Sequence, residues 1–205
     1  MTKMIAIIDS GAVNLQSVKK ALDFIGAESV ITDNPETINA CDKILLPGVG
    51  AFEDAIAKLR ASGLDEVVCE EARKGKPLLG ICLVMQLLFE KSYDFGEFEG
   101  LGLIEGAVRP IADVIPADYK IPHIGWNALH LVGEKSPIFQ YLNDGDHVYF
   151  VHSFYASGFA DSLVSVAEYQ IEVPASVECG NVCGCQFHPE KSGDVGLNIL
   201  RAFCE

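Results

Sequence analysis

One cysteine of the chain stands where a strand is expected to end and a helix to begin. Cys82 lies within residues 78–86, which read Leu-Leu-Gly-Ile-Cys-Leu-Val-Met-Gln. A sharp turn at such a junction exposes a side chain above the sheet, as in a nucleophile elbow. The positive end of the following helix would stabilise a thiolate there. A buried apolar cysteine fits the same pattern, so this segment alone leaves both interpretations open.

A base and an orienting group for such a nucleophile stand together in Gln186-Phe-His-Pro-Glu190. His188 would take the thiol proton and return it to a leaving amine, and Glu190 would hold the imidazole in one tautomer. Because Pro189 favours an extended conformation at His188, we expect His188 and Glu190 to face the same side. A strand end with a solvated His and Glu fits this segment as well. Together with Cys82, however, the segment indicates nucleophilic catalysis.

A third segment could stabilise the negative charge that forms during such a reaction. Residues 46–50 read Leu-Pro-Gly-Val-Gly and follow a predicted strand. Glycines let the backbone turn its N–H groups toward a ligand, and such donors stabilise a tetrahedral oxyanion. The N–H of Leu83, directly after Cys82, is the natural second donor. Taken alone, the segment also fits a simple strand-to-helix turn.

The elements that must position these residues alternate in the first half of the chain. Apolar β-branched runs predict strands, and apolar residues at helical spacing predict helices. Such a β-α rhythm predicts a parallel sheet with helices on both faces, and ligands bind at the carboxyl ends of its strands. The predicted strands are residues 4–8, 29–32, 43–46 and 77–81, and the predicted helices are 14–25, 52–60, 65–73 and 83–91.

The second half changes character, because short strand candidates separated by turns replace the alternation. They end in a hairpin around Gly180 and Asn181 and a closing helix over residues 193–203. The sequence therefore predicts one α/β domain over residues 1–205, with a mixed, mainly parallel sheet flanked by helices and antiparallel strands in its C-terminal half. The strand candidates are residues 108–109, 128–131, 148–151, 154–156, 164–169, 175–178 and 182–187.

Composition excludes several classes of protein. Hydrophobic residues make up 49% of the 205 residues, too many for a disordered chain, and no run approaches the ~20 apolar residues of a membrane-spanning helix. The net charge of −14 argues against nucleic-acid binding. Seven cysteines and an N-terminal apolar run too short for a signal peptide predict reduced thiols and a cytoplasmic location. The spacing of Cys179, Cys183 and Cys185 is not that of a zinc site, so no metal is expected.

Residues 80–86, taken with His188-Pro-Glu190, resemble the class I, triad-type glutamine amidotransferases. Further segments narrow the resemblance to the glutaminase subunits of imidazole glycerol phosphate synthases, which act in histidine biosynthesis. It extends over essentially the whole chain, with segments that match in order and spacing. These segments are Pro47-Gly-Val-Gly50, Pro122-His-Ile-Gly-Trp-Asn127, Tyr149-Phe-Val-His-Ser-Phe154 and Phe187-His-Pro-Glu-Lys-Ser192.

The resemblance implies a role for each matching residue. Cys82 would attack the side-chain amide of glutamine, forming a glutamyl thioester and releasing ammonia. His188 would serve as base and acid, and Glu190 would orient it. The matching oxyanion strand is Gly48, Val49 and Gly50, and the matching glutamine-binding residues are Gln86, Ser153 and Phe154.

The resemblance also implies a partner, a (β/α)8-barrel cyclase that forms a heterodimer with the glutaminase. Ammonia would pass through this barrel to a ribulosyl-aminoimidazole-carboxamide nucleotide. No metal or organic cofactor is implied. The residues that match the family's cyclase interface are Asn14, Trp126, Tyr149 and Lys191.

Two residues depart from the family pattern. Val84 stands where the family usually has glycine two residues after the nucleophile, and Val13 replaces the glycine of a Gly-Asn pair. A valine beside the elbow needs room, and overpacking costs about 1–3 kcal/mol when nothing relaxes. These departures favour a different interpretation, a degenerate subunit that only binds and regulates. A glutaminase of another synthase and a stand-alone cysteine hydrolase of γ-glutamyl compounds also fit the residues.

Overall fold

The computed structural model describes residues 3–11, 14–159 and 161–205. Val13, one of the two departures from the family pattern, lies outside the described residues. The helices are α1 (Leu15–Phe24), α2 (Pro35–Ala40), α3 (Phe52–Ala61), α4 (Leu64–Arg73), α5 (Leu83–Leu87) and α6 (Gly193–Cys204). The strands are β1 (Ile5–Ile8), β2 (Ser29–Thr32), β3 (Lys43–Gly48), β4 (Leu78–Cys82), β5 (Phe89–Ser92), β6 (Phe98–Glu99), β7 (Ile104–Pro110), β8 (His123–Ala128), β9 (His130–Leu131), β10 (His147–His152), β11 (Phe154–Ser157), β12 (Leu163–Glu168), β13 (Glu172–Cys179) and β14 (Val182–Cys185).

The central sheet is mixed, and this confirms the predicted fold class. Its strand order is β2-β1-β3-β4-β14-β13-β12-β9. The strands from β2 to β14 are parallel, whereas β14, β13, β12 and β9 pair antiparallel. The last strand of the chain therefore lies in the middle of the sheet, beside β4. This arrangement places the carboxyl end of β14 next to that of β4, where the elbow was expected.

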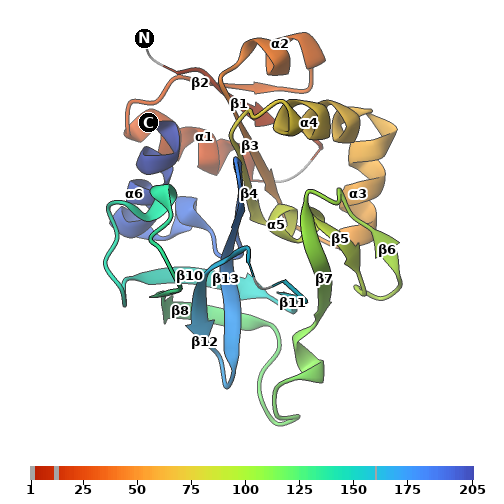
Figure 1. Cartoon of the computed structure of the whole chain (residues 1–205), viewed down its shortest axis with the longest axis vertical. Coiled ribbons are helices and arrows are strands. Elements are labelled where there is room, and N and C mark those ends of the chain that lie inside the picture. The colour runs from red at the N-terminus through yellow and green to blue at the C-terminus, as the bar shows by residue number, and fades with distance from the viewer. Residues whose placement is uncertain (1–2, 12–13, 160) are drawn as a thin grey trace.

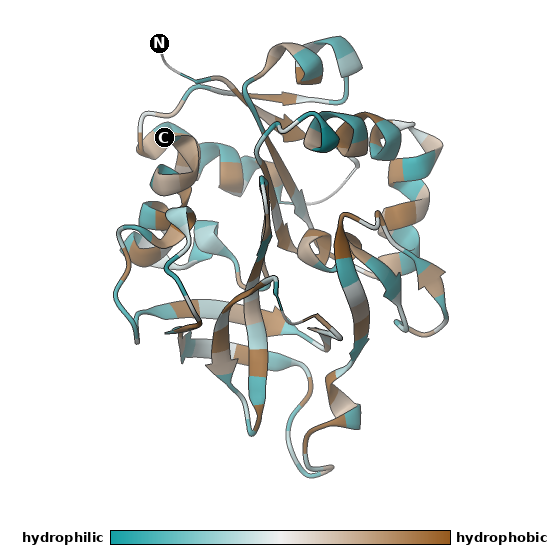
Figure 2. Ribbon diagram, viewed as in Figure 1, coloured by the Kyte–Doolittle hydropathy of each residue, from teal (hydrophilic) through white to brown (hydrophobic). Residues whose placement is uncertain are grey.

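Helices cover both faces of the parallel half, as Figure 1 shows. Strand β1 explains why, because its side chains alternate between two cores. Ala6 and Ile8 pack with the buried residues of α2, α3 and α4, while Ile5 and Ile7 pack with those of α1 and α6. All four residues are fully buried. Figure 2 shows the corresponding run of hydrophobic residues along the central strands.

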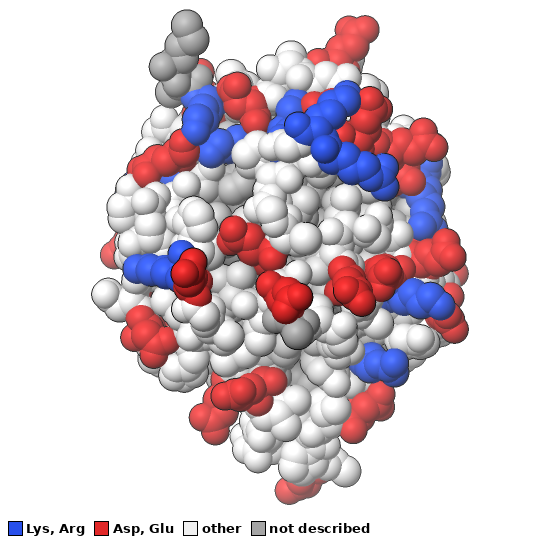
Figure 3. Space-filling view, in the orientation of Figure 1, with Lys and Arg blue, Asp and Glu red and all other residues white. Residues whose placement is uncertain are grey.

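Two smaller sheets complete the second half of the chain. Strands β10 and β8 form an antiparallel pair, and β11-β7-β5-β6 form a four-stranded sheet. Among the described residues, no helix combines the length and the apolar character that crossing a bilayer requires. On the face seen in Figure 3, acidic side chains are spread widely and the basic ones gather mainly in its upper part.

The predicted helix over residues 83–91 is wrong in its second half. Helix α5 ends at Leu87, and residues Phe89–Ser92 form β5, which pairs with β7 and β6. The backbone N–H of Leu101 donates to the Leu87 carbonyl, and that of Ile104 donates to the Leu88 carbonyl. The returning chain thus takes the carbonyls that a longer helix would have used. Pairing with distant strands outweighs helical spacing here.

A second prediction is wrong around residue 128. The strand expected over residues 128–131 is divided between two sheets, because Ala128 ends β8 and His130–Leu131 forms β9. Leu129, between them, is fully buried, and its N–H and carbonyl bond to the turn at Asp146 and Gly145. His123 is the first residue of β8.

Candidate active site

Cys82 stands at a sharp turn between β4 and α5. Its φ of 56° lies in the left-handed region, which costs a non-glycine residue energy and is typical of functional sites. The close crossing of α5 over β4 depends on Gly80, because a Cβ on that residue would lie 3.2 Å from the Met85 nitrogen. The predicted elbow is therefore present, and Cys82 directly precedes the N-terminus of α5.

His188 and Glu190 form a buried pair behind the cysteine. His188 Nδ1 lies 2.7 Å from Glu190 Oε1, and both side chains are almost completely buried. His188 is extended, as expected, and residues Pro189–Lys191 form a 3-10 turn. Proline suits the first position of this turn, because the N–H that Pro189 lacks would have no partner there. The turn brings the Glu190 carboxylate back to the His188 imidazole.

The carboxylate of Glu190 has a second donor, from the other end of the chain. Asn14 Nδ2 donates to Glu190 Oε1 at 2.6 Å. Asn14 has a φ of 90°, a conformation that asparagine tolerates better than most residues, and it immediately precedes α1. Sequence reasoning assigned Asn14 to a partner interface, and the structure gives it a contact with the candidate triad.

His188 is held ready to carry a positive charge. Burial alone would lower the pKa of His188, but the neighbouring Cys82 sulfur and the Glu190 carboxylate raise it to about 9. Its Nε2 atom has no hydrogen-bond partner of good geometry within the described part of the chain. A ring with one nitrogen fixed by a carboxylate and the other free suits a group that passes a proton to a reacting atom.

An open cleft brings most of the predicted site residues together. Cys82 and His188 line it, and six other predicted residues do so as well. Glu190 lies behind His188, and Gly48 lies beside the cleft, paired with Cys82 in the register of β3 and β4. The six further lining residues are Val49, Gly50, Leu83, Gln86, Ser153 and Phe154.

Two hydrogen bonds fix the side chain of Gln86 in the cleft. Its Nε2 atom donates to the Phe154 carbonyl at 3.3 Å and to Gln186 Oε1 at 2.9 Å. Gln186 in turn points Nε2 at Cys82 Sγ, 3.8 Å away. The side-chain Oε1 of Gln86 is therefore the atom left to face a ligand.

Val84 has the room that a valine beside the elbow needs. The side chain is 2% exposed and packs against Gly48, where a Cβ would lie only 2.7 Å from Val84 Cγ2. The absence of a side chain at Gly48 thus accommodates the valine that the family pattern lacks. Because the valine has this space, the overpacking that favoured a degenerate subunit does not arise at Val84.

This contact predicts coupling between the two residues. Gly48→Ala should lower the free energy of unfolding by about 1–3 kcal/mol through overpacking. In a Val84→Gly background the same change should cost less, because its clashing partner is gone. Chemical denaturation of the four proteins measures the coupling, and Val84→Gly should not lower glutaminase activity. As a control, Val18→Ala in α1, on the other face of the sheet, should show no such coupling to Gly48→Ala. Additive losses for Gly48 and Val84 would contradict the contact.

One site residue escaped sequence reasoning. Asp94 is 5% exposed and lines the cleft, and its Oδ2 accepts the Phe52 N–H at 2.9 Å. It thereby caps α3, whose own N-cap, Ala51, has no side-chain oxygen. Its Oδ1 is buried and has no partner among the residues that the structure describes. No sequence pattern indicated Asp94, because its position depends on the strand β5, most of which was predicted as helix.

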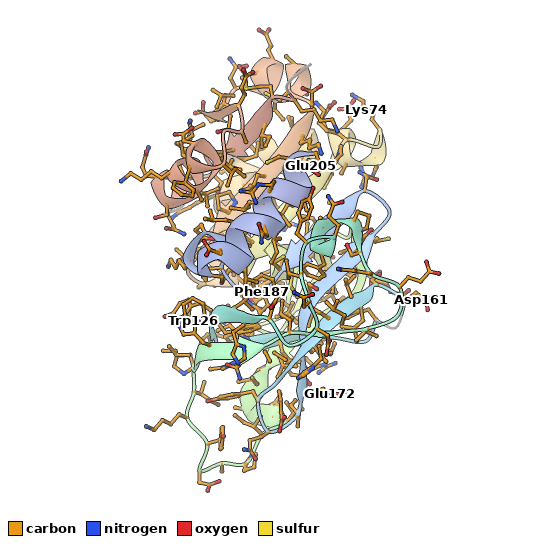
Figure 4. All side chains as sticks on the ribbon, turned by 90° about the vertical axis from the view of Figure 1, so that its left-hand side faces the viewer. Lys74, Trp126, Asp161, Glu172, Phe187 and Glu205 are labelled. Atoms are coloured by element: carbon orange, nitrogen blue, oxygen red, sulfur yellow. The ribbon has the colours of Figure 1, made fainter. Side chains whose placement is uncertain are left out.

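Two of the other residues proposed for an interface, Trp126 and Tyr149, lie opposite each other on β8 and β10. Trp126 is 55% exposed, and its ring centroid lies 6.0 Å from that of Tyr149 on the paired strand. Figure 4 shows Trp126 toward the edge of the molecule. Lys191 is exposed in the 3-10 turn that holds Glu190.

Comparison with known protein sequences gives one consistent result. The sequence profile of the family described as "Glutamine amidotransferase class-I" matches residues 6–205. The chain is 46% identical to the imidazole glycerol phosphate synthase subunit HisH of Oceanobacillus iheyensis, over 98% of each chain. It is 50% identical to the subunit of the same name from Geobacillus sp. WCH70, over 98% of this chain and 95% of that one.

Solved structures share the fold at much lower identity. A structure described as "Crystal structure of glutamine amidotransferase" has a TM-score of 0.74 at 19% identity, over 97% of this chain and 98% of that one. One described as "Structure of PurLQS from Thermotoga maritima" has a TM-score of 0.75 at 19% identity, over 99% and 98%. These two likenesses concern the fold.

Proposed function

Because this chain belongs to the class I glutamine amidotransferase family, we propose that its cleft hydrolyses glutamine with Cys82 as nucleophile. The ammonia would serve the formation of imidazole glycerol phosphate in histidine biosynthesis, as the names of the relatives at 46–50% identity suggest. The observation that carries the proposal is the elbow cysteine in one cleft with the buried His188–Glu190 pair.

The proposed reaction has two halves. Cys82 gives its proton to His188, and its sulfur attacks the side-chain carbonyl carbon of glutamine. His188 then returns the proton to the amide nitrogen, the C–N bond breaks, and ammonia leaves a glutamyl thioester. In the second half His188 takes a proton from water, the hydroxide attacks the thioester, and glutamate leaves as the sulfur recovers its proton. Glu190 stabilises the protonated ring at each step.

The developing oxyanion would be stabilised by backbone N–H groups. The N–H of Leu83 lies at the N-terminus of α5, where helix N–H groups are unpaired and the dipole favours negative charge. Val49 and Gly50 supply the second side of the site. They line the cleft and also a second cavity, bordered by Val84 and Leu87. This segment therefore has space on two sides in which its N–H groups can reorient.

Asp94 offers a site for the charged end of glutamine. A buried carboxylate oxygen without a partner is costly, and an ammonium group supplies both a hydrogen bond and a charge. We propose that Asp94 Oδ1 receives the α-ammonium group, while the backbone at Ser153 and Phe154 binds the α-carboxylate side.

Asp94→Asn should therefore raise the KM for glutamine by about 10–100-fold with little change in kcat, because one charge-assisted contact is lost. Steady-state glutamate release measures both constants. Asp54→Asn, an exposed carboxylate in the first turn of α3, is the matched control and should change neither. A lowered melting temperature with an unchanged KM would mean that Asp94 only caps α3.

An apolar surface beside the cleft supports a protein partner. Phe95 and Pro122 line the cleft, and Phe95 is 95% exposed. Ile124 and Trp126 lie two residues apart on the outer side of β8, and both are more than half exposed. Exposed apolar side chains gathered in this way are typical of interaction sites. We propose that the partner is a (β/α)8-barrel cyclase, bound through Asn14, Trp126, Tyr149 and Lys191, and that ammonia passes directly into it.

The proposal places this heterodimer in the cytoplasm and makes the glutaminase respond to the cyclase's ligand. All seven cysteines, each of which the structure describes, are free thiols, which agrees with a reducing compartment. Regulation through the partner has a physical route, since the Val49–Gly50 segment lies between two cavities close to the apolar surface.

The decisive experiment measures glutamate release from glutamine under three conditions. These are the chain alone, the chain with its cyclase, and the chain with cyclase and a bound nucleotide ligand. We expect turnover mainly in the third condition. Equal activity without a partner would favour a stand-alone hydrolase, and no turnover in a verified complex would favour a degenerate subunit.

A further inference from the structure

Two buried histidines stand side by side in the wall of the cleft. His123 begins β8 and His152 ends β10, directly opposite each other in the register of this antiparallel pair. They are 1% and 6% exposed. His152 lines the cleft, yet the proposed chemistry uses neither ring.

The two rings belong to one chain of hydrogen bonds. His152 Nδ1 lies 2.7 Å from the Phe154 carbonyl oxygen, and its Nε2 lies 2.9 Å from His123 Nδ1. His123 Nε2 lies 2.8 Å from Asn127 Oδ1, and Asn127 Nδ2 donates to the Glu168 carbonyl at 2.9 Å. The chain thus runs from the cleft, through β10 and β8, to the end of β12.

The Phe154 carbonyl is held from two sides. His152 approaches it from β10, and Gln86 Nε2 donates to it from α5. Both Gln86 and the backbone at Phe154 belong to the proposed glutamine site. Anything that shifts this carbonyl therefore shifts two groups that would contact the substrate.

The partners at the two ends of the chain fix its proton arrangement. Each end is a backbone carbonyl, which only accepts. The chain has four contacts, and each contact needs one N–H donor. Each neutral ring and the amide supply one donor apiece, so one contact lacks a proton in every tautomer and in either amide orientation. Burial lowers the pKa of His123 and lowers that of His152 to about 3, so both rings are neutral near pH 7. The unmatched contact must then fall on one link.

The link that gives way is at the Asn127 end. Asn127 is half-buried and can turn or meet water, whereas both rings are buried and His123 is stacked on Tyr169 and Phe150, with centroids 3.9 Å and 5.0 Å away. His152 therefore carries its proton on Nδ1, toward Phe154, and His123 carries its proton on Nδ1, toward His152.

We propose that His152 and His123 are positioning residues of the glutamine site, which act as a pair of Nδ1-protonated neutral rings that hold the Phe154 carbonyl and, through it, Gln86. This inference rests on the proposed glutaminase function. It gives the two histidines a task in substrate binding without contact to the reacting atoms.

The test uses the complex with its cyclase and compares donors at defined positions. In His152→Asn the side-chain amide stands where Nδ1 stood and can still donate to Phe154, whereas His152→Leu cannot. We expect His152→Leu to raise the KM for glutamine about tenfold, with kcat changed less than about threefold, and His152→Asn to restore most of the KM. His147→Leu, at the exposed start of β10, is the matched control and should behave as the unaltered protein.

The partner ring is tested in the same way, with His123→Asn keeping a donor toward His152 and His123→Gln moving it away. Long-range ¹⁵N spectra of the unaltered chain read the tautomers directly, and we expect Nδ1–H for both rings. An Nε2–H tautomer at His152, or an unchanged KM in folded His152→Leu and His123→Gln, would overturn the inference. If the unaltered complex released no glutamate at all, the proposed function would fail first, and the spectra would still decide the tautomers.

Discussion

Replacing Cys82 by alanine or serine should abolish glutamine-dependent synthesis by the complex and leave ammonia-dependent synthesis intact. The expected loss is at least about 10³-fold, because a thiol attack has no substitute in this cleft. Free ammonia bypasses this step and needs only the cyclase. Both rates are measured on the same purified complex, with glutamine or an ammonium salt as nitrogen source.

Cys179→Ser is the control for this experiment, since Cys179 is an exposed cysteine at the end of β13. It should retain both activities. If Cys82→Ala lost both, the substitution would have damaged folding or docking, and Cys82 would no longer be supported as the nucleophile.

Glu190→Gln should reduce glutamine hydrolysis by about 10²–10⁴-fold while preserving the fold. The amide keeps an oxygen that can accept from His188 and Asn14, but it lacks the charge that, together with Cys82, raises the pKa of His188. We therefore expect this pKa to fall from about 9 toward its ordinary value of 6.5. Glutamate release and an NMR titration of the His188 ring measure the two effects.

The same change should alter how stability depends on pH. A histidine whose pKa is raised on folding stabilises the protein fully below its unfolded value, here 6.5, and this contribution is lost as pH rises through about 9. The stability gap between the unaltered protein and Glu190→Gln should thus be largest below pH 6.5 and shrink toward pH 9. Asp194→Asn, an exposed carboxylate at the start of α6, should show no such trend. A gap that widened with pH would contradict the assigned role of the carboxylate.

The parallel half of the fold could be predicted because its signals are local. Apolar runs of four or five residues, separated by helical spacing, gave β1, β2, β3 and β4 almost at their observed bounds. The short helix α2 was missed although Asn34 caps it and Pro35 begins it, because six residues carry too little periodicity. The failure at residues 89–92 has another cause, since only pairing with β7 and β6 makes that segment a strand.

The site residues also divide into those that local motifs predict and those that depend on distant contacts. Cys82, His188 and Glu190 could be proposed because each lies in a compact motif whose chemistry is legible from residue types. The contact of Asn14 with Glu190 joins residues 176 positions apart, and no local pattern predicts it. Asp94 required knowledge of where β5 ends and which helix lacks a cap. Residues that act through distant partners are visible only once the fold is known.

The central place of β14 has a consequence for the order in which the molecule is made. A ribosome produces β4 and its cysteine about a hundred residues before β14, which pairs with β4 and delivers His188. Until β14 arrives, the proposed nucleophile has no base, and the edge of β4 has no neighbour on that side. On the proposed mechanism, a nascent chain therefore cannot release ammonia, and hydrolysis begins only in a molecule whose sheet is already closed. The exposed edge during that interval is the part of the chain that most needs protection from pairing with other chains.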